Sequence, residues 1–339
     1  MPLELRSGRP CRCHEQWSTN HEAEHTWTEK RSRANGVVKL AIKIDVDSLR
    51  STTIGVPRLT ALLEANAAGA TFLFSVGPDR SGRHIGRMFR RGMPGRLWRT
   101  KAVRDFDISG FLYGSMMPAP DIGNRAADTM RAVRDSGFET GLRAFDQIEW
   151  QQHIARRNSQ WVGRQMSMAR SRYEHIFGEA PRVHGAAGWQ MNRSAYRLTQ
   201  RLDFAYSSDT RGTHPFIPVF QAEVISCPQL PTTLPTLDEL IGRDGVDRNN
   251  VVQHVLGLTQ DPRSSGHVFT ASAAFEGLKL LPEFEQLLEG WRQQGYDIVS
   301  LHDYVASFDL QILPFHEVSN GLVAGRPGAV ALQGKEFLA

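Results

Sequence analysis

Residues 37–47 read Val-Val-Lys-Leu-Ala-Ile-Lys-Ile-Asp-Val-Asp, and this stretch decides the fold. Apolar side chains recur at every second position and alternate with positions that include Lys39, Lys43, Asp45 and Asp47. A period of two is typical of a β-strand that buries one face in a hydrophobic core. Asp45 and Asp47 are two residues apart at the end of this strand, so both carboxylates should project from the same face.

The residues after this strand continue as an alternation of helices and strands. Apolar spacing predicts a helix over 56–68 that stops at Gly69, then a strand over 70–76. Further helices are predicted near 124–135, 158–177, 192–201, 249–258 and 282–294. Further strands are predicted near 139–144, 204–207, 224–226, 268–271 and 298–300. This alternation predicts an α/β protein with a parallel sheet, and a single irregular (β/α) barrel fits the size.

Three segments of different character divide the chain. Residues 1–36 are polar and lack a periodic apolar face, so we expect a disordered leader, a barrel over 37–334 and a tail over 335–339. The leader carries five residues of types that bind metals, namely Cys11, Cys13, His14, His21 and His25. His21 to His25 matches the H-E-x-x-H zinc peptidase pattern, but its polar flanks argue against the buried helix that this chemistry needs.

Composition and charge limit the partners and the cellular compartment that we expect for this protein. The 339 residues include 40 Lys and Arg against 36 Asp and Glu, and this small positive excess does not indicate a nucleic-acid partner. No apolar run reaches the ~20 residues of a membrane-spanning helix, and the first 36 residues lack the apolar stretch of a secretory signal. Three cysteines cannot form a disulfide framework. We therefore expect a cytoplasmic protein.

A basic segment covers residues 80–104, with nine Arg or Lys and no acidic residue. Met88, Phe89, Leu97 and Trp98 lie among the cations. One interpretation is a surface that holds a phosphate or rests on anionic lipid at the inner face of the membrane, where each basic residue contributes about 1 kcal/mol. The alternative is a solvated basic loop between two barrel elements.

The Asp45–Asp47 pair needs a positive partner. Two carboxylates on one strand face repel each other, so a proton, a metal ion or a cationic side chain must neutralise them. The carboxyl end of a strand is where barrel enzymes hold their catalytic residues. A structural alternative is that Asp47 caps a helix or stabilises a turn.

Several short motifs, taken in chain order, resemble one enzyme superfamily. They lie at 43–47, 55–59, 74–79, 82–84, 186–189, 208–212, 234–244 and 325–326. Together they resemble the NodB-type polysaccharide deacetylases and, within them, the lipid-linked formamido-arabinose deformylases of lipid A modification. The resemblance extends from about Val37 to Gly334.

This resemblance implies an irregular (β/α) barrel that holds one divalent metal of the zinc type. In such enzymes the aspartate at the position of Asp45 is the general base, and the one at the position of Asp47 is a metal ligand. A His-x-x-x-His segment completes the metal site, and a histidine on a late strand is the general acid. The metal polarises the formyl carbonyl and activates water. The implied partner is a lipid-linked sugar phosphate.

The sequence departs from this family pattern at the positions of two metal ligands and of the general acid. Arg143 and Gln147 stand at the two histidine ligand positions, and Ser272 stands at the general-acid position. A guanidinium has no lone pair and stays protonated, and a serine hydroxyl cannot protonate a leaving amine near pH 7. We therefore expect no metal or other cofactor, and we predict that Arg143 replaces the metal beside Asp45 or Asp47.

Contact with the substrate is predicted for a further set of residues: Arg83, His84, Trp189, Asp209 and Arg211. For Arg211, an ion pair inside the barrel is an open alternative. His153 is expected to be an ordinary surface histidine, and Cys227 a buried apolar side chain.

Two hypotheses follow for function. The first is a catalytically impaired relative of the deformylases that still binds a polyprenyl-phosphate sugar. The second is a working hydrolase that releases formate from undecaprenyl-phosphate-linked 4-formamido-arabinose, with an unusual metal site or without a metal. Loss of two ligands and the acid together favours the first.

Overall fold

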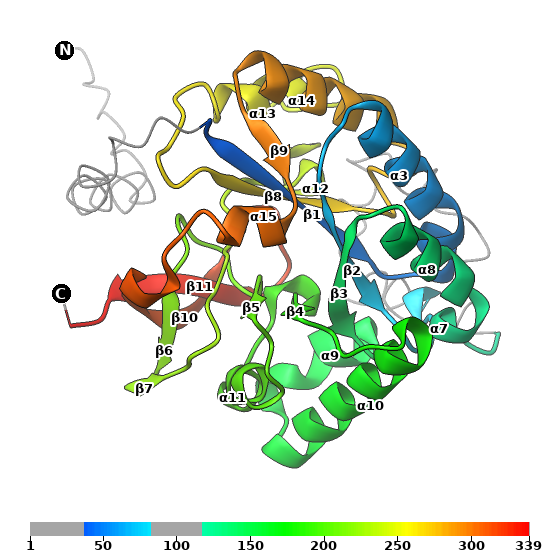
Figure 1. The fold of residues 1–339 in the computed structure, drawn as a ribbon, viewed down its shortest axis with the longest axis vertical. Helices are drawn as coiled ribbons and strands as arrows, with labels where there is room; N and C mark the ends of the chain where they lie inside the picture. The colour runs from blue at the N-terminus through cyan, green and yellow to red at the C-terminus, as the bar shows by residue number, and fades with distance from the viewer. Residues whose placement is uncertain (1–36, 83–116, 339) are drawn as a thin grey trace, which may run out of the picture.

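The computed structural model describes residues 37–82 and 117–338, and it contains one curled parallel sheet (Figure 1). Its strand order is β5-β4-β3-β2-β1-β8, with β9 alongside β1, and every neighbouring pair is parallel. The strands are β1 (Lys39–Val46), β2 (Thr71–Ser75), β3 (Glu139–Ala144), β4 (Val183–His184), β5 (Tyr206–Ser207), β8 (His267–Ser272) and β9 (Asp297–Val299). The predicted α/β fold and irregular barrel are confirmed.

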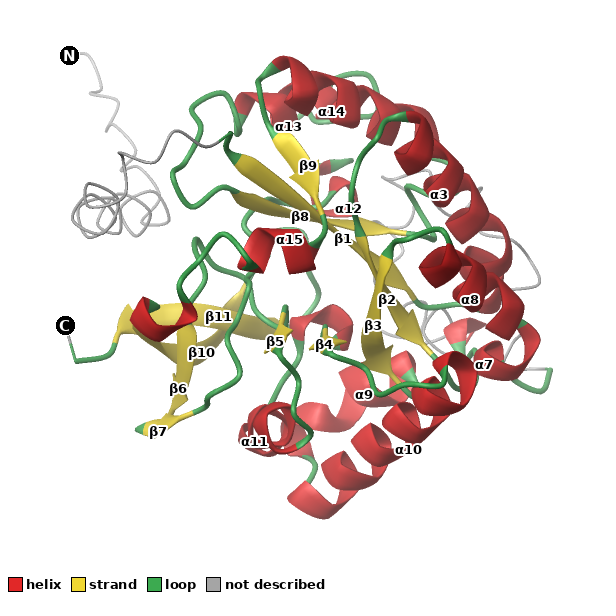
Figure 2. Cartoon of the chain, viewed as in Figure 1, coloured by secondary structure: helices red, strands yellow, loops and turns green. Residues whose placement is uncertain are grey.

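Helices cover the outer face of this sheet, as Figure 2 shows. The longer ones are α3 (Val56–Ala65), α8 (Ala127–Asp135), α10 (Ser159–Phe177), α11 (Arg193–Arg201) and α14 (Leu281–Gln293). The shorter ones are α7 (Ile122–Arg125), α9 (Gln147–His153), α12 (Leu237–Leu240), α13 (Val251–Gly257) and α15 (Leu301–Val305). Single turns complete the set at η1 (Ser51–Gly55), η3 (Ile154–Arg156), η4 (Ala187–Trp189) and η5 (Leu310–Ile312). None of the helices within 37–82 and 117–338 has the length and apolar character needed to span a bilayer.

Local sequence explains where individual helices begin and end. The side chain of Asn158 accepts a hydrogen bond from the backbone N–H of Trp161 and caps α10, which ends at Gly178 in the left-handed region with φ 76°. α3 carries a proline in its first turn. It ends at Ala65, three residues before the predicted limit, and Ala67 turns the chain with a positive φ of 44°.

A second sheet, which the sequence reasoning missed, packs beside the barrel. Its order is β11-β10-β6-β7, and the strands are β6 (Ile217–Phe220), β7 (Glu223–Val224), β10 (Phe315–Leu322) and β11 (Ala329–Glu336). β6 and β10 are parallel, and the other two pairs are antiparallel. The strand predicted at 224–226 is therefore wrong as a barrel strand, because residues 223–224 belong to this sheet.

One face of β1 packs in the main apolar core, and the other faces the barrel interior. Leu40, Ile42, Ile44 and Val46 are fully buried in the main core between the sheet and the outer helices. The alternate residues face the barrel interior, where Ala41 belongs to a smaller apolar cluster at the amino-terminal end of the strands. Further along the same face come Lys43 and Asp45, so the barrel interior changes from apolar to charged towards the carboxyl ends of its strands.

Candidate functional site

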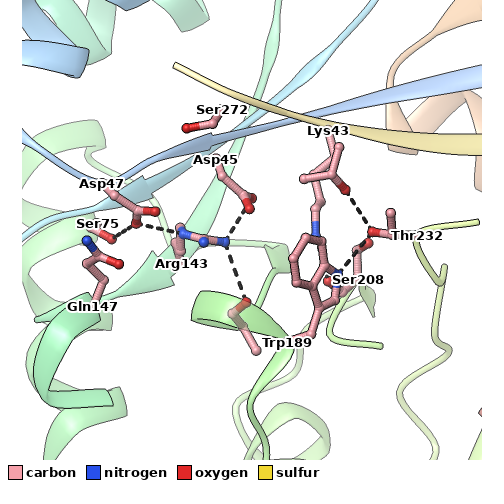
Figure 3. A network of polar contacts seen from close by, with 12 residues as sticks. Lys43, Asp45, Asp47, Ser75, Arg143, Gln147, Trp189, Ser208, Thr232 and Ser272 are labelled. Atoms are coloured by element: carbon pink, nitrogen blue, oxygen red, sulfur yellow. Dashed lines mark hydrogen bonds and ion pairs between the residues drawn. The ribbon is translucent and has the colours of Figure 1, made fainter. Parts of the chain in front are cut away.

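Neighbouring strands bring the predicted site residues to one edge of the sheet. Asp45 on β1 pairs in register with Ser272 at the end of β8. Asp47 is the first residue after β1, Ser75 ends β2, and Arg143 lies one residue before the end of β3. Because all these strands are parallel, their carboxyl ends lie together, as barrel enzymes require. Figure 3 shows the resulting cluster.

Arg143 connects the two aspartates. Its Nη1 lies 2.8 Å from Asp45 Oδ1, and its Nε donates a hydrogen bond of 2.7 Å to Asp47 Oδ1. Nη1 also donates to the carbonyl oxygen of Ala186 at 3.5 Å. The Arg143 side chain is 4% exposed, against 7% for Asp45 and 19% for Asp47. The predicted ion pair is therefore present, and it includes both carboxylates.

Burial and mutual attraction together set the pKa values in the cluster of Asp45, Asp47 and Arg143. Burial raises the pKa of Asp45, and the charges of Arg143 and Lys43 oppose that rise. Burial lowers the pKa of Arg143, but the attraction of Asp45 and Asp47 outweighs it and the pKa of the guanidinium is raised. The guanidinium thus remains charged and holds both acids.

Three cations surround the ring of Trp189. Lys43 Nζ lies 5.0 Å, Arg211 Cζ 4.9 Å and Arg326 Cζ 4.7 Å from the ring centroid, distances suited to cation–π attraction. The indole Nε1 donates to Thr232 Oγ1 at 3.0 Å. Trp189 has a φ of 52°, an unusual conformation for a bulky residue, which shows that its surroundings hold it firmly.

Each of these cations also has an oxygen partner. Lys43 donates to the carbonyl of Ser208 at 3.0 Å, and burial lowers its pKa to about 8. Arg211 Nη1 lies 2.8 Å from Glu239 Oε1, and Arg326 Nε donates to the same oxygen at 2.7 Å. The side chain of Arg326 is 22% exposed, whereas that of Arg211 is 10% exposed. Arg326 is therefore the more accessible of the two arginines on the Trp189 ring.

Comparison with curated proteins identifies the family. Over 297 residues the chain is 30% identical to a "Probable 4-deoxy-4-formamido-L-arabinose-phosphoundecaprenol deformylase ArnD" of Shewanella sediminis (strain HAW-EB3), and the match covers 88% of this chain and 95% of that protein. The chain belongs to this deformylase family. A protein with the same description from Wigglesworthia glossinidia brevipalpis is 28% identical over 286 residues, covering 84% of this chain and 98% of its own length. No family model matches the chain.

Solved structures place this deformylase family member in the expected fold. A putative polysaccharide deacetylase from Mycobacterium smegmatis superposes with a TM-score of 0.57 at 13% identity, over 86% of this chain and 98% of that one. At this identity the likeness supports the fold alone. It agrees with the NodB-type barrel that the motifs predict.

The donors at the aspartates do not fit the divalent metal that the deformylase family pattern implies. Arg143 lies between Asp47, which stands at the ligand position, and Asp45, which stands at the general-base position, and a guanidinium repels a divalent cation. Asp47 Oδ1 also accepts from Ser75 Oγ at 2.8 Å, and Gln147 Oε1 accepts from the amide of Gln151 at 2.9 Å. Within 37–82 and 117–338, no three or more His, Cys, Asp or Glu side chains gather in a group that could hold a metal ion.

Ser272 lies beside an acid that the sequence reasoning did not single out. Its backbone N–H donates to Glu276 Oε2 at 2.7 Å, and its hydroxyl accepts from the N–H of Ala274 at 3.3 Å. Glu276 is 1% exposed, and burial raises its pKa to about 8. Ser272 therefore has hydrogen bonds within its own turn, next to a carboxyl group that holds its proton at neutral pH.

The remaining predicted residues fall into two groups. Asp209 is fully buried, accepts from His184 Nδ1 at 2.8 Å and from the N–H of Ala186 at 2.7 Å, and so its known contacts are within the barrel. Its contact with substrate stays a prediction. Arg83, His84, most of the basic segment and the whole leader lie outside the described residues.

Two structural expectations can be checked directly. His153 is 30% exposed and contacts Glu149, as expected of a surface histidine. Cys227 is buried, and burial raises the pKa of its thiol to about 12, so it behaves as an apolar side chain.

Sequence reasoning missed Lys43, Glu239 and Glu276 as members of the site. Lys43 could have been found, because the period of two that places Asp45 inside the barrel places Lys43 on the same face. Glu276 follows a loop whose path no local pattern reveals, and Glu239 appears only inside the family motif at 234–244, without a role. Arg326 appears only in the family motif at 325–326, without a role.

Proposed function

We propose that this protein binds a sugar carried on a polyprenyl phosphate in the lipid A aminoarabinose pathway and has lost the metal-dependent hydrolysis of its family. The observation that carries the proposal is the guanidinium of Arg143 between Asp45 and Asp47. Related proteins are described as deformylases of 4-deoxy-4-formamido-L-arabinose-phosphoundecaprenol, which supplies the ligand class.

The physical argument concerns what each aspartate is free to do. Hydrolysis by the family pattern requires one carboxylate to take a proton from water and the other to bind the metal. Both are instead paired with one buried cation, and that cation cannot be deprotonated at any useful pH. Ser272 supplies no acid for the leaving amine. Binding needs none of these steps, and Trp189 with its three cations remains at the same edge of the barrel.

The test compares the unchanged protein with a variant that regains the family pattern. The variant carries Arg143→His, Gln147→His and Ser272→His together, and formate release from the lipid-linked formamido sugar is measured with added zinc. We expect binding without turnover in the unchanged protein and zinc-dependent turnover in the variant. Zinc-dependent turnover by the unchanged protein would refute the proposal.

A working hydrolase remains the second candidate, and Glu276 is the observation in its favour. A carboxyl group with a pKa of about 8 beside Ser272 has the protonation state of a general acid at neutral pH. Under this alternative, the unchanged protein releases formate without added metal and Glu276→Gln abolishes that release. Absence of metal-free turnover excludes this metal-free form of the second candidate.

We further propose that residues 80–104 place the protein on the inner face of the membrane, near its lipid-linked ligand. Nine basic residues, with apolar residues that include Met88, Phe89, Leu97 and Trp98 among them, give this segment the composition that anionic lipid surfaces attract. Residues 1–36 are proposed as a leader that the barrel does not need.

A further inference from the structure

Two histidines from distant parts of the chain face each other on the second sheet. His214 lies in the loop before β6, and His316 lies on β10. Their Nε2 atoms are 3.1 Å apart, and their rings are inclined by 71°. Neither residue belongs to the cluster around Arg143, and the proposed function gives them no part.

Hydrogen bonds on the far side of the His316 ring fix its proton. His316 Nδ1 lies 3.0 Å from the carbonyl oxygen of Gly334, which can only accept. Nδ1 therefore carries the proton of the neutral ring. The Nε2 atom of His316 consequently presents a lone pair towards His214.

The contacts of His214 lead to the same assignment. Gln333 Oε1 accepts from the backbone N–H of Thr213 at 2.8 Å, which orients the amide so that its nitrogen donates to His214 Nε2 at 3.1 Å. The Thr213 hydroxyl donates to Gln333 Oε1 at 3.4 Å, so His214 Nδ1 donates to that hydroxyl at 2.9 Å. His214 Nε2 is thus an acceptor, and two lone pairs face each other.

A metal ion would resolve this conflict. Two nitrogens at about 2.0–2.1 Å from a tetrahedral zinc ion lie roughly 3.3 Å apart, close to the separation of these two atoms. Histidines that bind metals commonly donate the other ring N–H to a carbonyl or another fixed acceptor, as both rings do here.

We propose that His214 and His316 bind one transition-metal ion of the zinc type, with water in the remaining coordination positions. His214 is partly exposed, so water can reach the ion. Binding would replace the contact between His214 and the Gln333 amide. The ion would join β10 to the loop that follows Arg211, and so would hold the second sheet against the segment that supplies a cation to Trp189.

Metal titration of the full chain tests this site. Protein stripped with a chelator is titrated with Zn²⁺ by calorimetry, in parallel with His214→Gln, His316→Gln and the control His302→Gln, which changes an exposed histidine on α15. We expect the unchanged protein and the control to bind one more equivalent than either site variant. Any zinc bound by the leader is common to all four proteins and cancels in the comparison.

Two readouts keep the test decisive. Saturating Zn²⁺ should raise the unfolding temperature of the unchanged protein and the control but not that of the two site variants. If a variant does not fold, anomalous scattering from zinc-soaked crystals of the unchanged protein should show an ion within about 2.0–2.1 Å of both Nε2 atoms. Equal zinc stoichiometry in all four proteins, or no ion between the rings, would overturn the proposal.

Discussion

Removing the guanidinium of Arg143 should strongly destabilise the protein. Arg143→Met keeps much of the side-chain volume but leaves Asp45, which is 7% exposed, without its nearest counter-charge. Breaking a buried ion pair by removing one partner costs about 3–5 kcal/mol, because the remaining charge is buried without compensation. We expect a loss of this size in the free energy of unfolding, measured by urea titration at pH 7.5.

The loss should depend on pH in a defined direction. Burial already raises the pKa of Asp45 in the folded protein, and removing Arg143 raises it further. The folded variant therefore binds a proton that the unfolded chain has released, so its stability falls as pH rises from the ordinary aspartate pKa to the folded one. The variant should be closer to the unchanged protein in stability at pH 5 than at pH 7.5.

Arg197→Met is the matched control, because it removes an exposed arginine that pairs with Glu223. Surface pairs of this kind contribute little, so the control should lose far less stability than Arg143→Met. If the two variants lose equal amounts, or if the loss at Arg143 is the same at both pH values, Arg143 is not the counter-ion of Asp45 and the reasoning fails.

Three further predictions concern other parts of the molecule. Burial raises the pKa of Glu276 from its ordinary value near 4.5 to about 8 in the folded protein. The folded protein therefore binds a proton that the unfolded chain has released, and its stability falls as pH rises through that range. Glu276→Gln should reduce this fall in urea titrations at pH 5, 6.5 and 8, and an unchanged pH profile would contradict the assignment. Gly178→Ala, whose new Cβ would meet nothing within 4 Å, should lose only the unfolding free energy that a left-handed alanine costs, about 1–2 kcal/mol. Gly188→Ala should lose more, because its new Cβ would lie 3.1 Å from the Gln151 side chain. Equal losses of unfolding free energy would show that Gly188 has room. Neutralising Arg90, Arg91, Arg96 and Arg99 should abolish co-sedimentation with anionic vesicles, and undiminished binding would remove the membrane proposal.

The barrel could be predicted because its strands carry their own signal. β1 shows a strict period of two, and β3 was placed at its observed limits, since each strand borders a turn or a helix with clear apolar spacing. The second sheet lacked such a signal. β10 contains Ser319, Asn320 and Gly321, and it pairs in parallel with β6 from about a hundred residues earlier in the chain, so only tertiary packing selects these strands.

The site residues that lie at the carboxyl ends of strands could be predicted from the sequence. The pairing of Arg143 with Asp45 and Asp47 followed from the family pattern and from charge together, because two acids on one face need a cation and Arg143 stands at a position where the family has a metal ligand. The partners on loops could not be found in this way. Arg326 reaches Glu239 from the turn between β10 and β11, and that approach depends on the second sheet.

The cation that lies between Asp45 and Asp47 decides whether this protein can use the chemistry of its family, and a crystal structure determined with zinc present identifies that cation directly. Anomalous scattering at the zinc edge distinguishes the ion from a guanidinium. We predict that Arg143 remains within ion-pair distance of both aspartates and that no zinc lies beside them, whatever His214 and His316 bind. A zinc ion within about 2.0–2.2 Å of a carboxylate oxygen of Asp45 or Asp47, with Arg143 displaced, would contradict the account.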